Sequence, residues 1–232
     1  MALIENKDIT LILPTLNEEK NIKDVLDIVN SLYPGISVIV ADDGSADKTQ
    51  DIVMDYREGD VTLLDRSSEK EKGLTGSVLD AIRLVTTKNI IVMDADLQHP
   101  PEKIKQIAEL LRHYDIVIGV REKVENSWPM HRKIMSWGGD ALARMRLVVK
   151  PFTCLDTMSG FFGIRTSLFK DIIQIHEKKY EKKGYKILFE TLKYIPQNTR
   201  IGYVNYVFGS RKRGESKIGG KHMIYHVKSV MK

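Results

Sequence analysis

The sequence predicts an α/β protein built on a mainly parallel, twisted β-sheet that helices flank. Short runs rich in β-branched residues alternate with segments in which apolar residues recur every three or four positions. The strand runs are apolar throughout, as expected of strands that helices cover on both faces. With 232 residues the chain suits one large domain with a substantial core, so we expect a single domain over residues 1–232.

The first half of the chain contains the clearest alternation of strands and helices. ITLILP (residues 9–14) is the first expected strand, and apolar residues three and four apart mark the helix that follows over residues 22–32. The next segments, in order, are SVIVADD, a helix over 47–58, VTLLD, a helix over 75–85, NIIVMDAD, a helix opened by Pro100 and Pro101, and DIVIGVRE. This order is typical of repeated strand–helix–strand units.

The second half changes character. GFFGIR and GYVNYVFGSR are expected strands, and residues 185–194 are expected to form a short helix. Residues 128–150 mix large apolar side chains with arginine and lysine. This mixture fits two structures equally well. One is an amphipathic helix in a membrane interface, and the other is a core-packing helix with a solvated basic face. Residues 218–232 are a second candidate for an interface helix.

The charge is unevenly placed. Of the net charge of +5, residues 121–150 carry +4 and residues 209–232 carry +6, which leaves −5 on the remainder. Such a basic face suits an anionic partner, and charge alone does not choose among a phosphate, a nucleic acid and an anionic membrane. The single cysteine, Cys154, reads as a packing residue and fits a reducing cytoplasmic setting. No run reaches the roughly 20 apolar residues that span a bilayer, so we do not expect this chain to cross a membrane by itself.

Polar clusters follow three of the expected strands, at residues 14–18, 42–45 and 94–96. In parallel α/β sheets, ligands bind beyond the carboxyl ends of the strands. We therefore expect these clusters to meet in one crevice.

The cluster DAD predicts a divalent metal site. In an extended strand the side chains of Asp94 and Asp96 point the same way, and Gln98 continues that row if the chain stays extended. Oxygen ligands on one side suit Mg²⁺ or Mn²⁺. Alternatively, one of the two aspartates could cap the helix that begins at Pro100 and Pro101. This role would explain one carboxylate and leave the other unexplained.

Three further features are less specific. Asp43, in DDGS, can accept hydrogen bonds from a nucleobase or ribose, although Asp-Gly-Ser is also an ordinary turn and helix cap. The backbone N–H groups and Lys72 of the glycine-containing loop 71–77 could hold phosphate, although the spacing is not that of a P-loop. His99 is expected to be a loop or helix-start residue that points away from Asp96.

Seven motifs in order give the sequence a family resemblance. PTLNEE, ADDGSADKT, KGLTGSV, VMDADLQHPPE, DTMSGFFGIR, GYKILFE and FGSRKRGESKIGGK, which run from about residue 9 to about residue 221, resemble those of family 2 glycosyltransferases, dolichol-phosphate mannose synthases among them. The resemblance implies a GT-A fold, a nucleotide-sugar donor, most often GDP-mannose, and transfer with inversion. It also implies a polyprenyl or dolichyl phosphate acceptor at a membrane surface rather than a nucleic-acid partner.

The resemblance carries over residue by residue. For the donor, it implies that the nucleotide contacts Pro14, Thr15, Asn17, Glu18 and Asp43, and that the diphosphate contacts Asp94, Ala95 and Asp96. The metal would be bound by Asp94, Asp96 and Gln98, and Arg213 and Lys217 would close over the donor diphosphate. The acceptor phosphate would be bound by Arg121, Arg132 and Ser136. Asp94, Asp96 and Arg213 are the expected catalytic residues. Asp156 matches a family position near the sugar, and we do not expect it to act as a catalytic base. We expect Glu190 to have a structural role rather than a catalytic one.

The charges suggest how such a reaction would run. A divalent cation, together with Arg213 and Lys217, would stabilise the negative charge that develops on the departing diphosphate. A lipid monophosphate, with a second pKa of about 6, is largely ionised at neutral pH and needs no general base. We expect this reaction at the cytoplasmic face of a membrane, with the protein either peripheral or anchored by C-terminal transmembrane segments that this chain does not include.

Other functions remain open on the sequence alone. The same donor site would serve a UDP-glucose-dependent polyprenyl-phosphate glucosyltransferase, or an enzyme that builds a polysaccharide and needs a base. A nucleotide-binding or nucleic-acid-binding module is a third reading, although a crevice rich in carboxylates would repel a polyanion.

Overall fold

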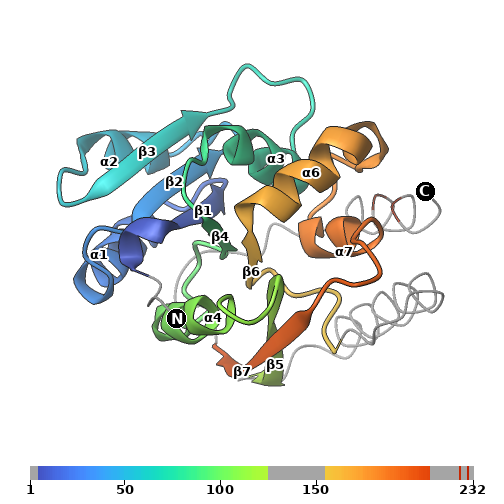
Figure 1. Cartoon of the computed structure of the whole chain (residues 1–232). Coiled ribbons are helices and arrows are strands. Elements are labelled where there is room, and N and C mark those ends of the chain that lie inside the picture. Colours follow the sequence, from blue (N-terminus) through green and yellow to red (C-terminus); the bar gives the residue numbers. More distant parts are fainter. Residues whose placement is uncertain (1–4, 125–154, 210–224, 226–228, 230–232) are drawn as a thin grey trace.

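A computed structural model describes residues 5–124 and 155–209 together with Tyr225 and Ser229. Seven strands form one sheet in the order β3-β2-β1-β4-β6-β5-β7 (Figure 1). The strands are β1 (Ile9–Thr15), β2 (Ser37–Asp42), β3 (Asp60–Asp65), β4 (Asn89–Val92), β5 (Ile116–Val124), β6 (Phe162–Arg165) and β7 (Ile201–Phe208). The described helices are α1 (Ile22–Leu32), α2 (Thr49–Asp55), α3 (Leu74–Leu84), α4 (Ile104–Leu110), α6 (Thr166–His176) and α7 (Ile187–Leu192), with short 3-10 turns at Asn6–Asp8, Pro101–Lys103 and Glu177–Lys179.

The sheet is parallel except at β6, which runs antiparallel to both β4 and β5. From β1 the chain first moves outward through β2 to β3, and then returns to place β4 on the other side of β1. A gap between the loops opens at such a change of direction, beyond the carboxyl ends of the strands. The topology therefore places the expected ligand-binding region at the ends of β1, β2 and β4.

Helices cover both faces of the sheet because side chains along each strand alternate between two apolar layers. Leu11 and Leu13 face the layer formed with α1 and α4, whereas Ile12 faces the layer formed with α3, α6 and α7. All three of these side chains are fully buried. The two layers clamp the strands, so the strand ends form a rigid platform for the loops.

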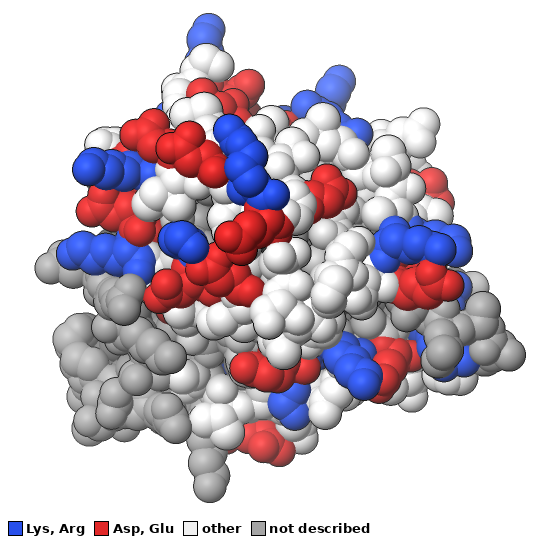
Figure 2. Space-filling model, turned by 90° about the vertical axis from the view of Figure 1, so that its left-hand side faces the viewer, with Lys and Arg blue, Asp and Glu red and all other residues white. Residues whose placement is uncertain are grey.

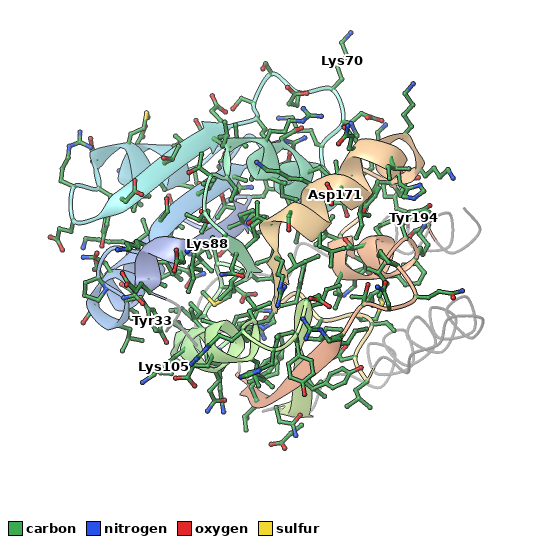
Figure 3. The ribbon with its side chains drawn as sticks, viewed as in Figure 1. Tyr33, Lys70, Lys88, Lys105, Asp171 and Tyr194 are labelled. Atoms are coloured by element: carbon green, nitrogen blue, oxygen red, sulfur yellow. The ribbon has the colours of Figure 1, made fainter. Side chains whose placement is uncertain are left out.

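Tyr33 fixes the helix that follows the β4 loop. Its hydroxyl donates to the carbonyl of Pro101 at 2.9 Å and accepts from the backbone N–H of Lys105 at 3.4 Å, which ties the end of α1 to the start of α4 (Figure 3). The loop between β4 and α4 is therefore anchored at both of its ends.

The described surface is mixed in charge where it can be seen beside α1, α2 and β3. Acidic and basic side chains are interspersed on this face, without a continuous basic field (Figure 2). This fits a sequence in which the basic excess lies in residues 121–150 and 209–232.

The sequence-based expectations agree with most of the fold. The strands are confirmed, but β4 ends at Val92 rather than at Asp96, and the second helix covers only Thr49–Asp55. The antiparallel β6 and the helix α6 were not expected. The expected interface helices at 128–150 and 218–232 lie outside the described residues, except for Tyr225 and Ser229, which are helical. In the part of the chain that the structure describes, no helix is both long and apolar enough to cross a membrane.

Candidate active site

The ends of β1 and β2 are joined by hydrogen bonds of the polar residues that follow them. The backbone N–H of Asp43 donates to the carbonyl of Thr15 at 2.9 Å, and the Thr15 hydroxyl donates to Asp42 at 3.3 Å. Asp42 also accepts from the backbone N–H groups of Gly44 and Ser45, at 3.1 and 2.8 Å. Asp42 thus shapes the turn that follows β2.

Asn17 and Glu18 connect the loops that follow β1 and β2. Asn17 has a positive φ of 52°, and its side-chain oxygen accepts from the N–H of Ala46 at 2.7 Å. Glu18 is buried, and its backbone N–H donates to the Thr49 hydroxyl at 2.8 Å. Together with Pro14, which pairs with Ala41 in the sheet, these residues lie where the sequence placed the nucleotide site.

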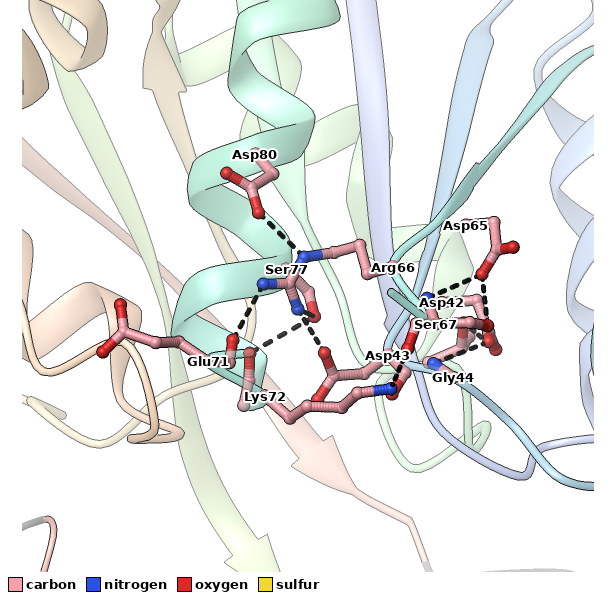
Figure 4. A network of polar contacts seen from close by, with 12 residues as sticks. Asp42, Asp43, Gly44, Asp65, Arg66, Ser67, Glu71, Lys72, Ser77 and Asp80 are labelled. Carbon is pink, nitrogen blue, oxygen red and sulfur yellow. Dashed lines mark hydrogen bonds and ion pairs between the residues drawn. The ribbon is translucent and has the colours of Figure 1, made fainter. Parts of the chain in front are cut away.

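Asp43 is held by a buried arginine that sequence reasoning missed. Arg66 directly follows β3, is only 2% exposed, and forms an ion pair with Asp43 (Figure 4). The nitrogen of this ion pair, Nη1, also donates to the Ser77 hydroxyl at 3.0 Å, while Nε donates to the Asp80 carboxylate at 2.9 Å and Nη2 to the Glu71 carbonyl at 3.0 Å. Burial raises the pKa of Asp43, and Arg66 opposes that rise by favouring the carboxylate. Because Arg66 follows an expected strand end, the same rule that selected Asp43 could have found it.

The glycine-containing loop 71–77 does not present its N–H groups to a ligand. The N–H groups of Thr75 and Gly76, in the first turn of α3, donate to the carbonyls of Gly184 and Lys182, both at 3.0 Å. The Lys72 ammonium donates to the carbonyls of Asp43 and Ser67 at 3.1 and 3.0 Å. A distant loop of the same chain thus occupies this helix terminus, which argues against the phosphate-binding role that the loop 71–77 could have had.

The cluster DAD lies in a turn rather than in a strand. Because β4 ends at Val92, the alternation of a strand does not orient Asp94 and Asp96. The Asp96 carboxylate, only 5% exposed, accepts from the N–H of Gln98 at 3.1 Å, and Leu97 between them has a φ of 59°. Both carboxylates nevertheless follow the end of β4, as predicted from the sequence.

The residues at this turn fit a divalent metal. A Cβ added to Gly160 would come within 2.8 Å of an Asp94 carboxylate oxygen, so the glycine keeps space beside that group. Two carboxylates and the amide of Gln98 provide the oxygen ligands that Mg²⁺ and Mn²⁺ prefer. Among the described residues no group of three His, Cys, Asp or Glu gathers as a metal site, so the amide is needed to complete this set.

Gln98 also joins the metal turn to the end of β7. Its carbonyl accepts from the N–H of Gly209 at 2.9 Å, and its side-chain nitrogen donates to the Gly209 carbonyl at 3.0 Å. The chain therefore enters the basic segment that begins at residue 210 directly beside the DAD turn.

His99 is a buried partner of Asp94, which sequence reasoning also missed. Its Nε2 atom lies 3.2 Å from an Asp94 oxygen, and its Nδ1 atom lies 2.9 Å from the Tyr206 hydroxyl. His99 is a loop residue as expected, but its ring is only 2% exposed. No local signal could have found the contact with Tyr206, since 107 residues separate the two.

Arg121 and Asp156 form a bidentate ion pair near the same turn. The Nε and Nη2 atoms of Arg121 donate to the two Asp156 oxygens at 2.7 and 2.8 Å. The loop from Asp156 continues to Gly160, which lies against Asp94. The structure thus places a guanidinium and its carboxylate partner beside the candidate metal site, where the sequence expected an acceptor site.

Glu190 is a structural residue, as expected. It is 1% exposed, pairs with Lys193 at 2.8 Å and accepts a hydrogen bond from the Ser229 hydroxyl. These contacts fasten α7 to the helical position at Ser229. The remaining expected site residues, Arg132, Ser136, Arg213 and Lys217, lie outside the described residues.

Comparison with solved structures identifies the fold. Glucosyl-3-phosphoglycerate synthase from Mycobacterium tuberculosis, in a complex with Mn²⁺, UDP and phosphoglyceric acid, superposes with a TM-score of 0.68 at 17% identity, over 96% of this chain and 77% of that chain. The uncomplexed structure of the same enzyme has a TM-score of 0.66 at 18% identity. At this identity the likeness concerns the fold alone, which is the GT-A fold predicted from the sequence.

Curated relatives share more of the sequence. The dolichol-phosphate mannosyltransferase of Pyrococcus furiosus is 34% identical over 96% of this chain and 62% of its own length, so the chain spans less than two thirds of that relative. The dolichol-phosphate mannosyltransferase of Saccharomyces cerevisiae is 29% identical over 95% of this chain and 85% of its own length. The undecaprenyl-phosphate mannosyltransferase of Micrococcus luteus is 31% identical over 90% and 86%.

The family model described as Glycosyl transferase family 2 matches residues 10–173, which include all three strand-end clusters. Because this match covers well over half of the chain and the relatives match nearly all of it, the chain belongs to glycosyl transferase family 2.

Proposed function

We propose that this glycosyltransferase moves mannose from GDP-mannose to a polyprenyl phosphate such as dolichyl phosphate, with inversion, at a membrane surface. The observation that carries the proposal is the likeness, at 29–34% identity over 90–96% of the chain, to relatives that are all named as polyprenol-phosphate mannosyltransferases. The arrangement of the site supports each part of the reaction in turn.

The donor would lie across the ends of β1, β2 and β4. Pro14, Thr15, Asn17, Glu18 and Asp43 would line the nucleotide, and Asp94, Ala95 and Asp96 would meet its diphosphate. Asp43 is suited to accept N–H groups of a base, because Arg66 holds its side chain in a fixed position inside the protein. The donor would thus bind to side chains that the fold has already oriented.

Asp94, Asp96 and Gln98 would hold Mg²⁺ or Mn²⁺. When bound, the cation neutralises the negative charge that develops on the departing diphosphate. Arg213 and Lys217 would add positive charge to the same group. Arg213 follows Gly209 by only four residues, and the backbone of Gly209 is hydrogen-bonded to Gln98.

The acceptor side supports a nucleophile that arrives ionised. Both oxygens of Asp156 already accept hydrogen bonds from Arg121, so the pair is arranged to hold the guanidinium in place. A phosphate monoester needs no general base, since its second pKa is about 6. Arg121, with Arg132 and Ser136, would orient that phosphate.

The surroundings of the acceptor would be a membrane. The segments 121–150 and 209–232 carry net charges of +4 and +6, which suit anionic lipid headgroups. We propose that the protein works at the cytoplasmic face, where nucleotide sugars would reach the crevice from the aqueous side.

A transfer assay tests the proposal. Purified protein is given GDP-mannose, UDP-glucose or other nucleotide sugars, a polyprenyl phosphate in detergent, and Mg²⁺ or Mn²⁺, and the glycolipid is detected by mass spectrometry. GDP-mannose is expected to be the preferred donor. Preference for UDP-glucose would indicate a glucosyltransferase, and transfer to sugar hydroxyls with no transfer to the lipid phosphate would contradict the acceptor assignment.

Asp96→Ala tests the metal assignment in the same assay. Loss of one of two carboxylate ligands is expected to abolish metal-dependent transfer, with thermal unfolding close to that of the wild type. Asp171→Ala, at an exposed carboxylate on α6, is the matched control and is expected to keep full activity. Full activity in Asp96→Ala would remove Asp96 from the metal site.

A further inference from the structure

His99 and Tyr206 form a chain of hydrogen bonds behind Asp94 that the reaction as described does not use. His99 lies in the turn after β4 and Tyr206 in β7, so the fold brings together two segments that are far apart in the sequence. Both side chains are only 2% exposed. Buried polar side chains of this kind are costly unless their hydrogen bonds are made, which suggests that the arrangement is specific.

The rings around His99 prevent it from rotating away. Its ring centroid lies 5.4 Å from that of Phe161 and 5.2 Å from that of Phe208, which meets it edge-on. Tyr206 is fixed as well, since its ring packs closely against Gly119. A Cβ added to Gly119 would come within 2.9 Å of the Tyr206 ring. The distances of 3.2 Å from Nε2 to Asp94 and 2.9 Å from Nδ1 to Tyr206 thus belong to a packed arrangement.

Both contacts are satisfied when the imidazole of His99 carries its proton on Nε2. Burial raises the pKa of Tyr206, so its phenol keeps the proton and can donate it. A carboxylate can only accept a hydrogen bond, so the Nε2 atom that faces Asp94 carries a proton, and the Nδ1 atom can accept from the Tyr206 hydroxyl. The Nε2–H group donates to the Asp94 carboxylate, the only acidic partner that His99 has among the described salt bridges.

We propose that Tyr206 and His99 are positioning residues for the donor diphosphate and metal site: Tyr206 holds His99 as the Nε2–H tautomer, and His99 fixes the carboxylate of Asp94. This proposal rests on the proposed function of that site. Gly160 lies against the same Asp94 carboxylate, so the carboxylate is held between a hydrogen-bond donor and a backbone that admits no Cβ. Metal ligands are commonly oriented by such partners, and losing one weakens metal affinity about 10–100-fold.

Metal affinity is one test, since it can be measured without transfer. Mn²⁺ binding is followed by electron paramagnetic resonance at a fixed GDP concentration. Tyr206→Phe removes only the hydroxyl and is expected to weaken Mn²⁺ affinity about tenfold, and His99→Ala is expected to weaken it at least as much. His99→Gln keeps an N–H group that can replace Nε2, so it should recover part of that loss.

The matched control is Tyr203→Phe, the same change in the same strand. Tyr203 packs against the opposite apolar layer and is expected to leave Mn²⁺ affinity unchanged. Thermal unfolding of each variant separates loss of fold from loss of the site. Wild-type affinity in both Tyr206→Phe and His99→Ala would overturn the proposal.

The tautomer gives an independent test. Long-range ¹H–¹⁵N correlation spectra distinguish a protonated from an unprotonated ring nitrogen, and we expect Nε2–H with a bare Nδ1 in the wild type and a mixture of tautomers in Tyr206→Phe. An Nδ1–H form in the wild type would overturn the proposal. If the wild type binds no Mn²⁺ with either GDP or UDP, the metal assignment of the proposed function fails, and the tautomer then decides whether the contact between His99 and Asp94 is as described.

Discussion

Two arginines share the carboxylate of Asp80, and they differ in burial. Arg66 contacts one Asp80 oxygen at 2.9 Å with a side chain 3% exposed, whereas Arg83 contacts the other at 3.1 Å with a side chain 58% exposed. Water screens an exposed pair, but it does not reach a buried one. Arg66 also holds Asp43, so its burial matters for the nucleotide site as well as for stability.

Arg66→Ala is expected to destabilise the protein by about 3–5 kcal/mol, because it leaves the buried carboxylate of Asp43 without its charged partner. Arg83→Ala removes the same group from a screened pair and should cost below about 1 kcal/mol. Urea unfolding measures both. Similar losses in the two variants would contradict the importance assigned to burial.

A second pair of arginines tests the acceptor site. Arg121 binds Asp156 in the crevice, and Arg200 binds Asp115 at 3.1 Å at the start of β7 with a side chain 57% exposed. Each is an arginine paired with an aspartate, but only Arg121 lies beside the DAD turn.

Arg121→Ala is expected to raise the KM for polyprenyl phosphate at least about tenfold, as loss of a charge-assisted phosphate contact would, and to leave GDP affinity nearly unchanged. Arg200→Ala should change neither. Both are measured by steady-state transfer kinetics together with nucleotide titration. A parallel loss of acceptor and nucleotide affinity in Arg121→Ala would indicate a structural role instead.

At the scale of elements, the start of α3 depends on a loop that lies more than 100 residues further along the chain. The carbonyls of Lys182 and Gly184 accept from the N–H groups of Gly76 and Thr75, both at 3.0 Å. The first N–H groups of a helix lack partners within the helix, so this loop acts as its cap. A Cβ added to Gly76 would come within 2.9 Å of Arg66 Nη2 and within 3.3 Å of the carbonyl oxygens of Glu71 and Lys182, so a larger side chain would be crowded here.

Gly76→Ala is therefore expected to destabilise the protein by about 1–3 kcal/mol, the usual cost of overpacking a filled site. Hydrogen exchange at the Thr75 N–H should become faster, since the loop must move away from the helix. Ser31→Ala, in α1, is the control and should leave this exchange rate unchanged. Unchanged exchange in Gly76→Ala would show that the loop is not held by this contact.

At the scale of the whole molecule, carboxylates with lowered pKa values make stability depend on pH. A hydrogen bond from Lys182 lowers the pKa of Glu177 below its ordinary value of 4.5, and hydrogen bonds from Ser67 lower that of Asp65 below 3.8. Each such group stabilises the fold fully above its unfolded pKa and loses this contribution as the pH falls through the folded value. Asp43 acts in the opposite sense, because burial raises its pKa.

The melting temperature is accordingly expected to fall as the pH is lowered from about 5 to about 3. Glu177→Gln should make this decline shallower, since one titrating group with a lowered pKa is removed. Glu69→Gln, at an exposed carboxylate of the loop between β3 and α3, is the control for the change in net charge. The measurement is calorimetry across this pH range, and an identical slope in wild type and Glu177→Gln would contradict the assignment.

The alternation of apolar strands and amphipathic helices was enough to predict the α/β class and the parallel first half of the sheet. These patterns arise because particular side chains of each segment are buried in the core. Each pattern is visible within a window of about ten residues. The helix α6 could also have been read, because Phe169, Ile172 and Ile173 have helical spacing. The antiparallel direction of β6 could not, since strand direction depends on which neighbours a strand meets.

The sequence by itself therefore determined the fold class, the positions of Asp43, Asp94 and Asp96, and, through its motifs, the family. Only the tertiary structure decided which groups hold these carboxylates: Arg66 for Asp43, and His99 with Tyr206 for Asp94. The physical reason is one of range. Periodicity reports how each segment is buried, whereas a hydrogen bond between residues 107 positions apart exists only after the sheet has brought two loops together.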